Sequence, residues 1–258
     1  MTAVAAAPPL SAAVVDRPHR FYVRMAATCV AVAVVGFAPT YFRPMASGSL
    51  RVAPIVHLHA ALFFGWTLFF LAQTWLAASG AVNRHREVGV AGVALATAML
   101  FVGRATAISS IKHHDAAGFG VAARAFSIVP LSGILLFAVL IAIALVNVKN
   151  PEIHKRVMLV ATVSLLQAGV GRWFLLFLAP PGAATAGPPP VFVTVMPGVF
   201  SDLLIVAAMV HDRRTRGAVH PVYWMAGGVL LAVQVLRVPF SATAQWTRVA
   251  EWAVTLAP

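Results

Sequence analysis

The sequence predicts an all-α fold, a polytopic membrane bundle of seven transmembrane helices followed by a C-terminal interfacial amphipathic helix. Three observations carry this prediction. Hydrophobic residues make up 60% of the 258 residues, charged residues make up 10%, and the mean hydropathy is +0.88, a composition typical of membrane proteins. Uncharged runs of about 20 residues, long enough to cross the hydrocarbon core, recur along the chain. The basic residues gather beside alternate runs, as the positive-inside rule requires.

The charge and the single cysteine exclude other classes of protein. A formal net charge of +12 would suggest a nucleic-acid partner for a soluble chain, but positive-inside topology explains it here, and we expect no nucleic acid to bind. Cys29 is the single cysteine, so an intrachain disulfide and a cysteine-based metal site are excluded. The lysines lie outside the centres of the apolar runs, which excludes a retinal Schiff base in the seventh helix.

The chain divides into a tail, a membrane domain and a terminal helix. Residues 1–20 are predicted to be a flexible tail, because they have no basic segment before their apolar part and contain Pro8-Pro9. The membrane domain is predicted over residues 21–239. Its seven helices are expected at residues 21–38, 54–79, 88–111, 125–147, 153–179, 191–210 and 221–239. The proline-rich residues 179–190 cannot be helical and form a loop, and Pro239 is expected to end the seventh helix.

Residues 240–258 are too short and too polar for another crossing. Apolar residues recur at helical spacing opposite Arg248 and Glu251. We therefore expect an amphipathic helix in the outer interface, with Trp246 and Trp252 at the level of the lipid headgroups.

The basic residues predict the orientation of the bundle. With seven crossings, the N-terminal tail and the loops after helices two, four and six share one side. That side holds eleven of the nineteen lysines and arginines: Arg17, Arg20, Arg24, Arg84, Arg86, Lys149, Lys155, Arg156, Arg213, Arg214 and Arg216. We expect a bacterial inner-membrane protein with a cytoplasmic N-terminus and a periplasmic C-terminus. Its partners are then the lipid bilayer and the anionic headgroups of the cytoplasmic face.

Three helices share a pattern, a histidine at the cytoplasmic start and an arginine near the outer end. A true internal repeat and chance placement in a basic chain both explain this pattern. The pairs are His85 with Arg104, His154 with Arg172, and His220 with Arg237.

One candidate site lies in the outer half of the predicted bundle. His59, Trp66 and Gln73 are spaced by seven residues and share one helix face. Arg104 and Arg172 are expected at a similar depth, where an unpaired cation is costly. We therefore predict a positively charged cavity bordered by His59, Arg104 and Arg172. The alternatives are an interfacial histidine bonded to backbone or water, and arginines that reach the headgroups.

A second candidate set has a structural or relay role. It consists of Asp202, Gln234 and Arg237. Asp202 is the one acid inside a predicted crossing, and we expect it to pair with Arg172 or Arg104. Among the arginines inside the predicted crossings, Arg237 is the one whose side chain could best extend to the headgroups.

Several of these residues form a pattern H-x-H, then W, Q and H-R-x-x-G, that resembles an uncharacterised group of bacterial multi-pass membrane proteins. The resemblance extends to the segment from His154 to Arg172 and to His220-Pro221. It implies a shared fold and carries no activity. The residues of the pattern are His57, His59, Trp66, Gln73, His85, Arg86 and Gly89.

The leading functional hypothesis is a membrane binding or redox-accessory protein that holds an anionic amphiphile in its outer half. Haem suits this description, with His59 as axial ligand and Arg104 and Arg172 binding the propionates. One alternative is a transporter of a small organic anion or of protons that uses Asp202. Another is a structural subunit whose apolar faces meet partners in a membrane complex.

Overall fold

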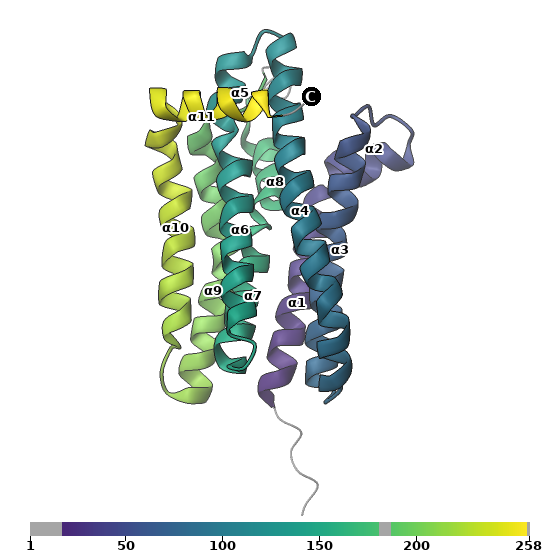
Figure 1. Ribbon diagram of the computed structural model, residues 1–258, viewed down its shortest axis with the longest axis vertical. Coiled ribbons are helices and arrows are strands. Elements are labelled where there is room, and N and C mark those ends of the chain that lie inside the picture. Colours follow the sequence, from purple (N-terminus) through teal and green to yellow (C-terminus); the bar gives the residue numbers. More distant parts are fainter. Residues whose placement is uncertain (1–16, 181–186, 257–258) are drawn as a thin grey trace, which may run out of the picture.

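The computed structural model describes residues 17–180 and 187–256, and within these ranges the protein is helical with no strand. Seven helical segments are long and apolar enough to cross a membrane, as the sequence predicts. They stand side by side as one bundle (Figure 1). Residues 1–16 of the predicted tail lie outside the described ranges, as do 181–186 of the proline-rich loop and 257–258, whereas residues 17–20 already belong to the first helix.

The first three crossings differ from the prediction mainly in length. The first comprises α1 (Arg17–Phe37), a π-helical turn η1 (Ala38–Phe42) and α2 (Arg43–Ala46). Pro39 lies in the π-helical turn, where a missing N–H interrupts the regular bonding. The second is α3 (Pro54–Ala78), and the third is α4 (Val82–Ala116). The 35 residues of α4 include the basic residues 84–86 and the polar residues 112–115, which lie on either side of the predicted helix 88–111.

The fourth and fifth crossings are each broken once. The fourth consists of α5 (Gly120–Phe126) and α6 (Ile128–Val146). Pro130 explains this break, because it has no N–H to donate to the carbonyl of Phe126. The fifth consists of α7 (Pro151–Ser164) and α8 (Gln167–Leu178), which meet at Leu165 and Leu166.

The last two crossings lead into the terminal helix. The sixth is a 3₁₀ turn η3 (Val191–Thr194) with α9 (Val195–Arg216), and the seventh is α10 (Pro221–Ser241). The helix α10 continues past Pro239 to Ser241, so the expected stop at this proline is wrong. A proline removes only one backbone hydrogen bond of the helix, so α10 can continue for two residues beyond Pro239.

The turns of the bundle fall at two ends (Figure 1). The start of α1 and the turns α3–α4, α6–α7 and α9–α10 lie together at what we call the basic end. The short helices α2 and α5 and the terminal α11 (Ala244–Thr255) lie at the other, C-terminal end. This grouping is the one that seven crossings require.

Packing is closest where small residues let backbones approach. A Cβ atom added to Gly36 of α1 would lie 2.6 Å from the Cα atom of Gly169 in α8. Trp66 fills the middle of the core with 1% of its surface exposed, and its ring meets Phe137 edge-on at 5.0 Å. The core therefore consists of close-packed apolar side chains at this level.

The terminal helix α11 crosses the C-terminal end of the bundle (Figure 1). Trp246 is 8% exposed, and its Nε1 donates to the carbonyl of Arg124 at 2.8 Å. Trp252 is 62% exposed. Trp246 therefore anchors α11 to the bundle, whereas the Trp252 ring faces away from it.

Candidate functional site

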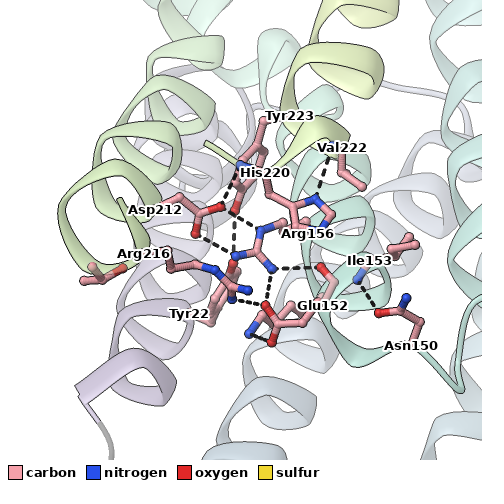
Figure 2. Close-up of polar contacts among 12 residues, drawn as sticks. Tyr22, Asn150, Glu152, Ile153, Arg156, Asp212, Arg216, His220, Val222 and Tyr223 are labelled. Atoms are coloured by element: carbon pink, nitrogen blue, oxygen red, sulfur yellow. Dashed lines mark hydrogen bonds and ion pairs between the residues drawn. The ribbon is translucent and has the colours of Figure 1, made fainter. Parts of the chain in front are cut away.

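A buried ion pair organises the basic end of the bundle (Figure 2). Arg156 of α7 is 1% exposed. Its Nε donates to Oδ2 of Asp212 at 2.9 Å, and its Nη2 donates to Oδ1 at 2.7 Å. Its Nη1 donates to the carbonyl and to Oε2 of Glu152 at 2.8 and 2.7 Å. The guanidinium is thus bonded on every side, which is what a buried cation requires.

Further contacts extend this network to three other helices. Asp212 of α9 accepts from the backbone N–H of His220, which precedes α10, at 3.3 Å. Arg216 also binds Glu152. The hydroxyl groups of Tyr22 in α1 and Tyr223 in α10 are 3.1 Å apart. The cluster therefore ties α1, α7, α9 and α10 together, and its full bonding marks it as a structural clamp.

This clamp is not evident from the sequence, because Arg156 and Asp212 both lie near helix ends, where Arg156 is counted with the loop cations. The asparagine–proline start of α7, with Asn150 accepting from Ile153 N–H at 3.3 Å, was the available signal. It places the helix start at Pro151, two residues earlier than expected, so Arg156 lies in the second turn of α7.

Two histidines lie beside each other at the same end. Nδ1 of His85 is 3.2 Å from the carbonyl oxygen of Gln73, and Nδ1 of His154 is 2.8 Å from the carbonyl oxygen of Ala144. A carbonyl only accepts, so each Nδ1 carries a proton, and in the neutral form of each ring Nε2 presents a lone pair. The ring centres are 6.4 Å apart and the planes are inclined by 87°. Each imidazole also closes its own hairpin, α3–α4 or α6–α7.

The side chain of Gln73 belongs to the same region. It is 6% exposed, and neither its Oε1 nor its Nε2 has a hydrogen-bond partner among the described residues. Seven residues earlier, Trp66 Nε1 donates to Thr162 Oγ1 at 3.2 Å. Because α3 and α7 run in opposite directions, two turns toward the basic end bring Gln73 level with His154.

The repeat inferred from the sequence is only partly matched in the contacts. His85 and His154 make the same bond to the helix that precedes them. His220 instead accepts from the N–H of Val222 at 3.3 Å and so caps α10.

The residues predicted in the outer half occupy separate settings. The ring of His59 stacks on Phe63 at 4.0 Å, and its buried Nδ1 has no partner among the described residues. The guanidinium of Arg172 lies 3.8 Å from the ring centre of Phe37 and also bonds to its own helix. Arg104 is exposed and forms no hydrogen bond or ion pair with the described chain.

A groove does lie in this half, but it differs from the predicted cavity. It has a volume of about 350 Å³ and runs between α1 and α3. His57 borders it where His59 was expected, and its lining carries no arginine. The imidazole of His57 is held by the Tyr41 hydroxyl, 2.9 Å from Nδ1. The embedded cations are therefore not gathered around this groove.

Asp202, Gln234 and Arg237 do lie together. Nε2 of Gln234 donates to Oδ1 of Asp202 at 3.3 Å. Arg237 is 4% exposed, and its Nη2 donates to Oγ1 and to the carbonyl of Thr194 at 2.8 and 3.3 Å. It is close enough to act electrostatically on Asp202. The three residues come from α9 and α10, and η3 supplies Thr194 as the partner of Arg237.

Two expectations about these charges are wrong. Asp202 pairs with neither Arg172 nor Arg104, because those side chains are turned to α1 and to the surface. Arg237 does not reach for the headgroups, because Thr194 holds it inside. Of Arg104, Arg172 and Arg237, the exposed one is Arg104.

The chain matches none of the protein-family models, curated proteins or solved structures with which it was compared. Among the described residues, no group of three or more His, Cys, Asp or Glu side chains is placed to hold a metal ion. Three polar clusters remain as evidence of function: the Arg156–Asp212 clamp, the His85–His154 pair, and the set of Asp202, Gln234 and Arg237.

Proposed function

We propose that this protein is an integral membrane haem-binding protein, in which His85 and His154 would hold the haem iron. The single observation that carries the proposal is the pair of imidazoles, each held through Nδ1 and each with an Nε2 lone pair. Hydrogen bonding of the second ring nitrogen to a carbonyl is the usual support of a metal-ligating histidine. The proposed site lies at the basic end, not in the outer half.

The ring spacing would allow both imidazoles to hold one metal ion. Imidazole nitrogens bind transition metals at about 2.0–2.1 Å, so an ion lies roughly 3 Å from each ring centre and two opposed rings stand about 6 Å apart. The rings of His85 and His154 are 6.4 Å apart. They come from different hairpins, so the two hairpins would close on the ligand from both sides.

The surrounding chemistry favours haem over a bare ion. A bare ion would have two protein ligands here, while haem supplies four nitrogens of its own and needs only two axial ligands. Arg84 and Arg86 flank the first histidine, and both are exposed. Such cations oppose a bare divalent ion and favour the two propionates. The Gln73 amide offers a further donor. When bound, haem supplies one-electron chemistry, and the residues hold and orient it.

The test is an absorption spectrum of the protein purified in detergent, before and after addition of ferric haem. We expect the Soret and visible bands of a low-spin, six-coordinate haem. His85→Ala and His154→Ala should each abolish the low-spin bands. His59→Ala, at the ligand predicted from the sequence, and His113→Ala, at the C-terminal end, should leave them intact.

Each variant is checked for helical content by circular dichroism, so loss of haem is separated from loss of fold. A folded wild type that gives no ligated haem spectrum would contradict the proposal. So would low-spin bands that persist in folded His85→Ala and His154→Ala variants.

We also propose a bacterial inner-membrane location with the basic end in the cytoplasm, beside anionic headgroups. The support is the gathering of basic residues at this end. Reporter fusions should place residues 84–86, 149–156 and 212–217 in the cytoplasm and the C-terminus outside. A cytoplasmic C-terminus would contradict this orientation.

A further inference from the structure

The helix α9 carries two carboxylates in opposite settings. Asp212 receives two guanidinium bonds from Arg156 and a backbone bond from His220. Asp202, ten residues earlier, receives one amide bond from Gln234 at 3.3 Å. Both oxygens of Asp212 contact a guanidinium, whereas Asp202 has no cation in direct contact. The two carboxylates therefore cannot have the same role.

Three polar atoms around Asp202 are buried and have no hydrogen-bond partner among the described residues. They are Oδ2 of Asp202, Oε1 of Gln234 and Nε of Arg237. Gln234 and Arg237 are 1% and 4% exposed. Gly198 makes room for this arrangement, because a Cβ atom there would lie 2.8 Å from the Cδ atom of Gln234. A buried polar group without a partner costs about 1–3 kcal/mol.

The chemistry of these three atoms specifies what complements them. Two are acceptors and one is a donor, so the matching molecule donates two hydrogens and accepts one. Water meets this requirement, and buried waters typically make about three hydrogen bonds to such groups. A small metal cation would also find oxygen ligands, but the Arg237 guanidinium opposes its charge.

We infer that Asp202, Gln234 and Arg237 form a hydrated proton-exchange site inside the membrane, in the C-terminal half of the bundle. A proton passes from hydronium through the bound water to Oδ2 of Asp202. One O–H bond forms at the carboxylate as one O–H bond of the hydronium breaks, and no electrons are transferred. The proton leaves by the reverse step.

The neighbouring charges allow both protonation states. Arg237 keeps its bonds to Thr194 when Asp202 becomes neutral, so no salt bridge is broken. Besides α10 and η3, α9 packs against α7 and α8. The arginine of α8, Arg172, is engaged with Phe37 of α1. The charged groups of α7 lie at the basic end with Asp212. Arg237 is therefore the cation that acts on Asp202.

The test is infrared difference spectroscopy of the haem-free protein in lipid vesicles, between neutral and acidic pH. We expect a carboxylic acid C=O band on acidification that moves to lower frequency in D₂O, because water reaches the site. Asp202→Asn should remove this band, and Asp202→Glu should shift it. Asp115→Asn, at the exposed partner of Arg124, is the matched control and should leave it unchanged.

Several outcomes would overturn the inference. One is a wild-type spectrum with no protonated carboxyl band across the pH range. Another is a band that survives in Asp202→Asn, or one that does not move after prolonged exposure to D₂O. The D₂O measurement and Asp202→Glu keep the test decisive even if the asparagine variant does not fold. None of these measurements depends on haem, so the two proposals fail separately.

Discussion

Asp212→Asn is expected to destabilise the bundle severely, because it removes the charge that faces Arg156. Asp212 and Arg156 are each 1% exposed, so solvent cannot replace the lost carboxylate. Breaking one partner of a buried ion pair costs about 3–5 kcal/mol. Arg156 keeps two bonds to Glu152, which places the expected loss near the lower end, at about 3 kcal/mol.

The assay is reversible unfolding in mixed detergent micelles, with the free energy of unfolding measured for each variant. Asp202→Asn on the same helix is the matched control and should cost much less, because no cation contacts Asp202 directly. The double variant Arg156→Met with Asp212→Leu should recover most of the loss, since apolar replacement of a buried pair is often neutral or stabilising. A loss below about 1 kcal/mol for Asp212→Asn, far under the range for a buried pair, would refute the reasoning. A double variant as unstable as the single one would do the same.

Two further predictions concern a helix cap and a helix contact. Burial lowers the pKa of His220 from 6.5, so the stability that its neutral ring provides is complete above about pH 6.5 and falls as the pH drops below it. His220→Asn keeps a side-chain acceptor for the Val222 N–H but does not titrate, so the melting temperature of this variant should depend less on pH than that of the wild type. An unchanged pH dependence of the melting temperature would argue against the cap. Gly36→Ala places a Cβ 2.6 Å from Cα of Gly169 and should cost about 1–3 kcal/mol in the same unfolding assay. Gly65→Ala, which meets nothing within 4 Å, is its control, and equal losses would count against the close contact.

The fold was predictable because length and hydropathy determine which segments cross a membrane. The break at Leu165 and Leu166 was not, since no proline or glycine marks it and tertiary packing decides it. The direction of Trp246 was also beyond prediction. Amphipathic spacing places it on the apolar face of α11, but only the packed bundle shows that this face meets protein.

The candidate sites were predictable to the extent that their contacts are local. Gln234 and Arg237 are three residues apart on one helix face, so the sequence alone places them together, and Asp202 is recognisable as the one acid inside a predicted crossing. The pair of Arg156 and Asp212 is separated by 56 positions. Charge alone cannot choose among nineteen basic residues, so this contact needed the three-dimensional arrangement.

The histidines that close the two hairpins also bear on how the protein is assembled during synthesis. His85 reaches back 12 residues and His154 reaches back 10, so both bonds are complete once their own hairpins have been made. Short loops close quickly and at low entropic cost. The Arg156–Asp212 contact must wait for α9, and the Tyr22–Tyr223 contact spans 201 residues. We therefore expect each imidazole to be oriented by its own hairpin before the partner hairpin docks.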